Sequence, residues 1–178
     1  MSVAAILMAA GGSRRLGRPK QLVEVEGRTL VRRTAELLLE AGYEPVVVVL
    51  GAVVEPVRAE LAPLPVDSVA REGWQSGMAG SIGAGLAALP DRVEATLVTP
   101  CDLPKLELGV LAALKAESGP EALAACAFAG TLGPPALFGR RWFDDLARLE
   151  GDGGAKSLLR RHGAREIPWP EGAEDLDE

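Results

Sequence analysis

Short apolar runs alternate along this chain with segments whose apolar residues recur at helical spacing. One run covers residues 3–9, and another, residues 45–50, contains four consecutive valines. Between them, apolar side chains recur every three or four residues from Leu30 to Ala41, and Gly42 is placed to end that helix. A continuous β-branched run is typical of a strand buried on both faces, as in a parallel sheet. These segments therefore predict a β-α-β unit.

The same alternation continues through most of the remaining sequence. Helices are expected at residues 53–61, 81–89, 106–115, 142–149 and 155–161. Strands are expected at residues 66–70, 95–99, 122–129 and 136–138, with Gly133-Pro134-Pro135 as a turn between the last two. The acidic residues 171–178 are expected to form a solvated tail. We therefore predict an α/β fold with one doubly wound, mostly parallel sheet.

Charge excludes some partners and favours others. A chain of 178 residues with 48% hydrophobic content fits one domain, and its net charge of -6 argues against nucleic acid as a partner. Seven of the 19 basic residues nevertheless fall in one short stretch, as Arg14, Arg15, Arg18, Lys20, Arg28, Arg32 and Arg33. This stretch predicts a site for a small anion.

The cysteines and the single histidine exclude zinc chemistry. Cys101 and Cys126 are far apart in apolar segments, and His162 cannot complete a Cys-His ligand set. The apolar opening is short, and its arginines follow it instead of preceding it, which is the wrong order for a signal peptide. No apolar run is long enough to span a membrane. We therefore expect a protein of the reducing cytoplasm with no membrane partner.

The loop after the first strand is the main functional signal. Its segment Ala9-Ala10-Gly11-Gly12-Ser13 is followed closely by Arg15 and Lys20. Ligands of such sheets bind outside the carboxyl ends of the strands, where glycines let backbone N–H groups approach phosphate oxygens. Arg15 and Lys20 would add full positive charges as negative charge develops on the α-phosphate. A surface turn with solvated arginines is the alternative interpretation.

Two other phosphate-binding motifs fail on inspection. Gly12 and Gly17 have the spacing of a P-loop, but Arg18 and Pro19 stand where that loop needs Lys and then Ser or Thr. The segment Gly83-Ala84-Gly85 matches a looser dinucleotide fingerprint, yet it follows no expected strand. We interpret it as a run of small residues in a packed helix.

Asp102 follows a strand whose residues are apolar or threonine, so its carboxylate is expected at the same sheet edge as the glycine loop. Mg²⁺ is usually held by one or two carboxylates together with substrate phosphates, which makes Asp102 a candidate metal ligand. The alternative is that Asp102 caps the following helix. Cys101 is interpreted as a small buried residue instead of a nucleophile, because no histidine lies near it in sequence.

A third segment, residues 73–81, contains Gly77 and ends at Ser81 ahead of an expected helix. Its backbone donors and the Ser81 hydroxyl are suited to a nucleotide. The alternative is a loop in which Ser81 is the N-cap and Trp74 is a hydrophobic anchor.

In this order, the motifs resemble the nucleotidyltransferases that mature molybdenum cofactor, especially the molybdopterin cytidylyltransferase branch. The family pattern Ala-Ala-Gly-x-Ser-x-Arg-Met-Gly-x-Pro-Lys appears at residues 9–20 with Leu16 in place of Met. Further family motifs are matched at Trp74, Gly77, Met78 and Ser81, at Asp102 and Pro104, and within residues 135–138 and 151–155. The resemblance runs from about residue 3 to residue 162 and implies a Rossmann-like nucleotidyltransferase domain over residues 1–178.

The resemblance also implies roles for individual residues. Backbone groups of Ala9, Ala10, Gly11, Gly12 and Ser13 would bind the nucleotide, Arg15 and Lys20 its phosphates, Gly77 and Ser81 its nucleoside side, and Asp102 the Mg²⁺ ion. The Ala-Ala-Gly opening is closer to cytidylyl members than to guanylyl members, which favours CTP over GTP. The implied acceptor is molybdopterin, and the product would pass to a molybdoenzyme.

Several departures from the family leave the acceptor open. Gly133-Pro134 replaces a common Gly-His, Arg71-Glu72 replaces Asn-Pro, and Glu171 stands where many members carry a second metal carboxylate. Glu171 substitutes for that ligand or the chain lacks it. A sugar phosphate or another small phosphorylated metabolite is the alternative acceptor. A non-catalytic chaperone for the cofactor is the alternative from another class of function.

Overall fold

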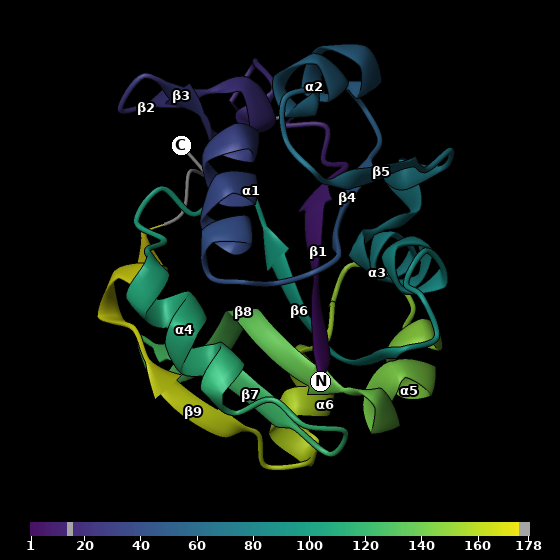
Figure 1. Cartoon of the computed structure of the whole chain (residues 1–178), viewed down its shortest axis with the longest axis vertical. Helices are drawn as coiled ribbons and strands as arrows, with labels where there is room; N and C mark the ends of the chain where they lie inside the picture. Colours follow the sequence, from purple (N-terminus) through teal and green to yellow (C-terminus); the bar gives the residue numbers. More distant parts are fainter. Residues whose placement is uncertain (14–15, 175–178) are drawn as a thin grey trace.

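The computed structural model describes residues 1–13 and 16–174, and a seven-stranded sheet forms its centre (Figure 1). The strand order is β5-β4-β1-β6-β8-β7-β9. The first four strands are mutually parallel, β8 runs antiparallel to both β6 and β7, and β9 is parallel to β7. The expected α/β fold with a mostly parallel sheet is confirmed.

Each strand of this sheet except β9 overlaps an apolar run in the sequence. The strands are β1 Ser2–Ala9, β4 Val46–Leu50, β5 Asp67–Ala70, β6 Val93–Pro100, β7 Leu123–Phe128, β8 Thr131–Gly139 and β9 Arg165–Pro168. A separate hairpin pairs β2 Glu24–Val25 with β3 Arg28–Thr29. All five residues of β4 are buried, as the run of valines predicts for a strand covered on both faces.

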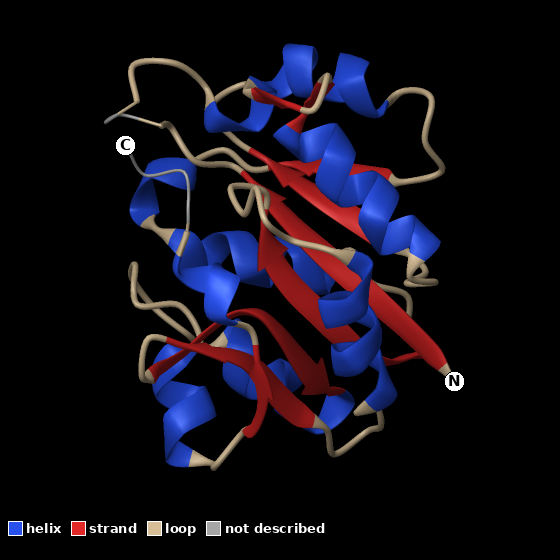
Figure 2. Ribbon diagram, turned by 90° about the vertical axis from the view of Figure 1, so that its left-hand side faces the viewer, coloured by secondary structure: helices blue, strands red, loops and turns tan. Residues whose placement is uncertain are grey.

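Helices flank the sheet on both sides (Figure 2). The α-helices are α1 Leu30–Glu40, α2 Val54–Leu61, α3 Met78–Ala87, α4 Leu108–Ala116, α5 Phe143–Ala147 and α6 Lys156–Arg161. Short 3-10 helices are η1 Lys20–Leu22, η2 Trp74–Ser76, η3 Arg140–Trp142 and η4 Pro170–Ala173. Gly42 follows α1 with φ of 80°, so it ends that helix as expected. None of the helices in the described part of the chain combines the length and apolar character needed to cross a membrane.

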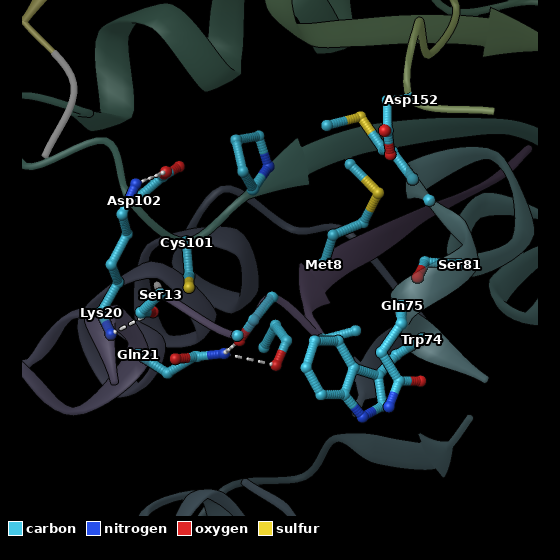
Figure 3. Close-up of a pocket in the computed structure, with 17 residues that line it drawn as sticks. Met8, Ser13, Lys20, Gln21, Trp74, Gln75, Ser81, Cys101, Asp102 and Asp152 are labelled. Carbon is cyan, nitrogen blue, oxygen red and sulfur yellow. Dashed lines mark hydrogen bonds and ion pairs between the residues drawn. The ribbon is translucent and has the colours of Figure 1, made fainter. Parts of the chain in front are cut away.

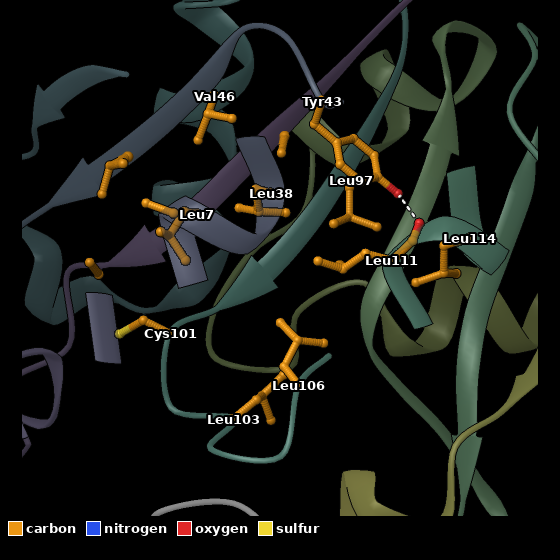
Figure 4. Packing of buried hydrophobic residues seen from close by; sticks show 14 of the residues in the cluster. Leu7, Leu38, Tyr43, Val46, Leu97, Cys101, Leu103, Leu106, Leu111 and Leu114 are labelled. Carbon is orange, nitrogen blue, oxygen red and sulfur yellow. Dashed lines mark hydrogen bonds between the residues drawn. The ribbon is translucent and has the colours of Figure 1, made fainter. Parts of the chain in front are cut away.

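The two faces of the sheet carry separate apolar cores. On one face, α1, α2 and α4 pack over strand residues such as Leu7 and Leu97 (Figure 4). On the other face, α3, α5 and α6 cover Ile6 and Phe138. In the first core, the fully buried Tyr43 hydroxyl donates to the Leu111 carbonyl oxygen at 2.7 Å. This hydrogen bond satisfies a polar group that would otherwise be costly to bury.

Stability is expected to fall at alkaline pH because of three buried acidic groups. Burial raises the pKa of Cys101 and of Cys126 from 9.0 to about 12, and it also raises the pKa of Tyr43. The unfolded chain therefore loses these protons at lower pH than the folded chain does, so their stabilisation is complete below about pH 9 and is lost as pH rises toward 12. Each group contributes a slope of up to about 1.4 kcal/mol per pH unit.

Urea unfolding between about pH 8 and about pH 11 measures this slope. Replacing Cys126 with alanine removes one of the three groups, so the free energy of unfolding should be lower overall and fall less steeply with pH. An unchanged slope in Cys126→Ala would contradict the assignment.

The Gly133-Pro134-Pro135 segment lies inside β8, so its expected role as a turn is wrong. The actual turn between β7 and β8 is formed by Ala129 and Gly130, both with positive φ. The proline pair is accommodated because the β7–β8 register shifts between Ala125 and Cys126. This irregularity leaves the prolines outside the ladder, where their missing N–H groups cost no hydrogen bond.

Two further segments differ from expectation. Residues 170–173, where the acidic tail was expected to begin, form η4 with Gly172 buried, while residues 175–178 lie outside the described part of the chain. The strand β9 was not predicted, because its four residues alternate too weakly in hydropathy to stand out. The two edge strands, β5 and β9, are both four residues long and largely exposed.

Candidate active site

A cavity of about 470 Å³ opens at the carboxyl ends of β1 and β6 (Figure 3). Four segments far apart in the sequence meet there: the loop after β1, the residues around η2, the segment after β6, and the loop that contains Asp152. The cavity is lined by Met8, Ala9, Ala10, Gly11, Gly12, Ser13, Lys20, Gln21, Trp74, Gln75, Gly77, Met78, Ser81, Pro100, Cys101, Asp102 and Asp152. All the predicted site residues within the described chain therefore converge, and Arg15 lies outside the described residues.

The glycine loop is held in place from its far end. Ser13 has a φ of 50°, a left-handed conformation that costs a residue with a side chain roughly 1–2 kcal/mol. Its Oγ accepts a hydrogen bond of 2.8 Å from the backbone N–H of Lys20, which closes the loop. Gly11 and Gly12 are exposed at the mouth of the cavity, where their backbone is open to a ligand.

Gln21 supports the same loop through side-chain hydrogen bonds to its backbone. The sequence analysis did not predict this role. Its Nε2 donates to the carbonyl oxygens of Ala9 and Gly11 at 2.9 and 2.8 Å, and the residue is only 2% exposed (Figure 3). One amide thus fixes both the end of β1 and the start of the loop. Its position directly after Lys20, with no charge of its own, gave no signal of this role.

Lys20 and Asp102 form an ion pair on one side of the cavity, with 3.3 Å between Nζ and Oδ2 (Figure 3). Their side chains are 17% and 24% exposed, so the pair faces the cavity and is still shielded from bulk solvent. Such shielding strengthens the interaction of a cation with an arriving phosphate. Asp102 does not cap a helix, because α4 begins six residues later and Glu107 is its N-cap.

The carboxylates that line the cavity suit a divalent cation completed by substrate oxygens. Asp102 and Asp152 are the acidic residues on its described wall, and the described residues contain no cluster of three or more metal-ligating side chains. Mg²⁺ needs only one or two carboxylates beside substrate phosphates. Glu171 lies in η4 and is not among the cavity-lining residues, so Asp152 is the second carboxylate that the structure brings to the site.

The opposite wall of the cavity is built from residues 74–81. Helix α3 begins at Met78 with Gly77 as its N-cap, so Ser81 lies in the first turn and is not the cap that the alternative interpretation required. Gly77 has a φ of 115°, and a Cβ there would lie 2.7 Å from Asp152 Oδ1. Glycine is therefore required for the close approach of the loop that carries Asp152. The backbone N–H of Ala79 donates to Gly151 O at 3.2 Å and fixes this approach.

Cys101 lines the cavity but is a poor nucleophile. Its side chain is buried, and burial raises the pKa of the thiol to about 12, with the neighbouring Asp102 charge adding to the shift. The reactive thiolate is therefore negligible at neutral pH. This agrees with the interpretation of Cys101 as a packing residue.

Loop donors, a shielded cation and a carboxylate at one sheet edge are the groups that a nucleotidyltransferase needs to hold a nucleoside triphosphate. Comparison with known proteins agrees with this class. The family model described as "MobA-like NTP transferase domain" matches residues 5–166. The chain belongs to this MobA-like family of nucleotidyltransferases.

Individual relatives carry different names. Nicotine blue oxidoreductase from Paenarthrobacter nicotinovorans is 34% identical over 176 residues, which covers 94% of this chain and 83% of the relative. A probable molybdenum cofactor guanylyltransferase from Bacillus cytotoxicus is 32% identical over 106 residues, covering 59% of this chain and 51% of the relative. The match therefore spans about half the length of that guanylyltransferase.

Among solved structures, Rv0371c from Mycobacterium tuberculosis H37Rv superposes with a TM-score of 0.87 at 30% identity, over 100% of this chain and 93% of that chain. A second structure of Rv0371c is a complex with manganese, with a TM-score of 0.83 at 27% identity over 99% and 95% of the two chains. The fold is therefore shared over the full length, and that relative binds a divalent metal.

Proposed function

We propose that this protein transfers CMP from CTP to the terminal phosphate of molybdopterin and releases pyrophosphate. The observation that carries the proposal is the Lys20–Asp102 pair, which faces the glycine loop within one cavity. The resemblance to molybdenum cofactor nucleotidyltransferases supports the acceptor, and so does the related guanylyltransferase. The product would be delivered to a molybdoenzyme in the cytoplasm.

In this mechanism the acceptor phosphate attacks the α-phosphorus of CTP, a new P–O bond forms, and the P–O bond to pyrophosphate breaks. Asp102 would hold Mg²⁺, which would supply positive charge to the phosphates, and Asp152 is the other carboxylate that lines the cavity. Backbone N–H groups of residues 10–13 bind phosphate oxygens, and Lys20 leaves Asp102 to meet the charge that develops on the α-phosphate. Positioning and electrostatics carry the catalysis, so no protein nucleophile is needed.

A second cavity, of about 230 Å³, supports an acceptor with a flat body. It shares Met8, Met78, Pro100 and Asp152 with the nucleotide cavity, so the two are adjacent. Most of its remaining wall is apolar and comes from α3, β6 and β8. Such a wall packs well against the face of a ring system, whereas burying the hydroxyl groups of a sugar there would leave them without partners. This favours a pterin over a sugar phosphate.

The preference for CTP is proposed from Ala10. Its backbone oxygen and its Cβ, together with Trp74 Cβ, all lie within 3 Å of where a Cβ on Gly51 would be. Ala10 and Trp74 both line the cavity beside Gly51, and the Ala10 methyl group narrows the space available to a base compared with glycine at this position. A methyl group discriminates by only about 1–3 kcal/mol, so residual use of GTP is expected.

The test is an incubation of the protein with Mo-loaded molybdopterin, Mg²⁺ and either CTP or GTP, with pyrophosphate and the dinucleotide quantified by mass spectrometry. We expect the cytidine dinucleotide to predominate by roughly tenfold or more. Preference for GTP would reject the cytidylyl assignment. Turnover with a sugar phosphate but not with molybdopterin would reject the acceptor, and binding without turnover would favour the chaperone function.

The relative named Nicotine blue oxidoreductase, which is matched over 94% of this chain, favours one other function. In that case the apolar cavity would hold a flat aromatic compound that accepts electrons from a reduced nicotinamide. Incubating the protein with reduced nicotinamide cofactors and a quinoid dye tests this directly. Cofactor oxidation with no release of pyrophosphate from any NTP would replace the transferase proposal.

A further inference from the structure

Arg71 binds three groups of the loop that forms the nucleoside side of the cavity, although it does not line the cavity itself. It follows β5, and its backbone N–H donates to Leu50 O at 2.8 Å, which continues the pairing of β5 with β4. The backbone of Arg71 is therefore fixed to the sheet. Its guanidinium group reaches across the start of α3.

The guanidinium hydrogen bonds connect the sheet to this loop. Nη1 donates to Gly77 O at 2.9 Å and to Ser81 Oγ at 3.3 Å, and Nη2 donates to Ser76 Oγ at 2.6 Å. The backbone groups of an α-helix N-terminus carry partial positive charge, so a cation there is electrostatically unfavourable by itself. The three acceptors compensate for this, and they span the whole stretch from η2 to the first turn of α3.

The contact with Ser81 determines what its hydroxyl can offer a ligand. A serine hydroxyl has one proton to donate and lone pairs that accept. Because Arg71 donates to Ser81 Oγ, the hydroxyl proton is left for a different partner. Ser81 lines the cavity on the same side as Trp74 and Gln75 (Figure 3). The hydroxyl is thereby prepared to donate to an oxygen atom of the nucleotide.

We propose that Arg71 is a positioning residue for the nucleotide: it fixes the loop of residues 74–81 and sets the Ser81 hydroxyl as a donor. The inference rests on the proposed binding of a nucleoside triphosphate in this cavity.

Gly80 provides a way to break the hydrogen bonds between Arg71 and residues 76–81 without changing Arg71 itself. A Cβ on Gly80 would overlap the guanidinium group, whose end is flexible enough to swing away. Alanine also favours the helix more than glycine does. Gly80→Ala should therefore remain folded, because the gain in helix propensity offsets part of the loss of the Arg71 hydrogen bonds. Gly83→Ala is the matched control, because it makes the same change in the same helix where a Cβ meets nothing within 4 Å.

The experiment measures calorimetric Kd for CTP and GTP with Mg²⁺, together with melting temperature, in wild type, Arg71→Ala, Gly80→Ala and Gly83→Ala. For the nucleotide that wild type binds more tightly, we expect Kd to rise roughly tenfold in Arg71→Ala and in Gly80→Ala, and to stay unchanged in Gly83→Ala. Where turnover is measured, KM should rise by a similar factor while kcat changes little.

Addition of Ser81→Ala to Arg71→Ala completes a double-mutant cycle. Because Arg71 acts partly through Ser81, the double variant should lose less than the product of the two single losses. Wild-type affinity in Gly80→Ala, or independent effects of Arg71 and Ser81, would overturn the inference. If Arg71→Ala does not fold, Gly80→Ala decides the question. Failure of wild type to bind either nucleotide would instead reject the proposed function on which the inference rests.

Discussion

Asp102→Asn is expected to lower turnover by at least about a hundredfold while the protein remains folded. Asparagine has the same size, and its amide oxygen can still accept the hydrogen bond from Lys20, so the wall of the cavity is preserved. What is lost is the negative charge that would hold a divalent cation next to the triphosphate. The charge supplied by a metal is worth several kcal/mol in the transition state, and each 1.4 kcal/mol is about tenfold in rate.

Pyrophosphate release at saturating CTP and Mg²⁺ measures this effect, with circular dichroism as the check on folding. Asp91→Asn is the matched control, because Asp91 is an exposed carboxylate that precedes the opposite end of the same strand, β6. It should leave turnover unchanged. Near-wild-type Mg²⁺-dependent turnover in Asp102→Asn would show that the carboxylate is not the metal ligand.

Lys20→Ala is expected to reduce kcat by about 10- to 100-fold, with a smaller change in the affinity for CTP. The lysine is paired with Asp102 when the cavity is free of ligand, so part of its interaction with a ground-state triphosphate is offset by the loss of that pair. Negative charge grows on the transferring group during the reaction, and the shielded ammonium interacts with it more strongly than with the bound substrate.

Steady-state kinetics separate the two effects, and Arg18→Ala provides the control. Arg18 belongs to the same loop but is exposed, so its removal should change kcat very little. If Lys20→Ala changed neither kcat nor KM, the loop would be a solvated turn. Because Lys20 and Asp102 contact each other, the losses in the double variant should not multiply.

The main strands and the location of the site could be predicted because each depends on local sequence. A run such as the valines of β4 can be satisfied only by burial on both faces, and the carboxyl ends of adjacent parallel strands necessarily share one edge. The shared location of Asp102 and the loop after β1 at one sheet edge follows from that rule alone. Their pairing through Lys20 at 3.3 Å confirms that the two segments meet.

The supporting residues could not be predicted, because their roles exist only through tertiary contacts. Gln21 supports the loop through an amide that reaches Ala9 and Gly11, and Arg71 donates a hydrogen bond to Gly77 O just after η2. Asp152 comes to the cavity from a loop that approaches Gly77, about 75 residues earlier in the chain. The glycine-rich segment around Asp152 matched a family motif, and that was the signal available for its role.

The turn predicted at residues 133–135, which lie inside β8, was wrong for a different reason. Glycine followed by two prolines ordinarily marks the end of a strand. Here Pro134 and Pro135 are extra residues of β8 between two consecutive pairs of the β7–β8 ladder, and the true turn uses Ala129, a residue with weak turn propensity. The local rule fails at this position because the strand continues past an irregularity that leaves both prolines unpaired.

The two borders of the central sheet limit how copies of this protein can associate. A strand with unpaired N–H and C=O groups is a template on which another chain can add, and long, flat, apolar borders promote aggregation. Here β5 begins with Asp67, while β9 carries Arg165 and Glu166 and closes on Pro168, so each border is only four residues long and bears charge or a missing donor. Continuation of the sheet from one molecule into the next is therefore disfavoured.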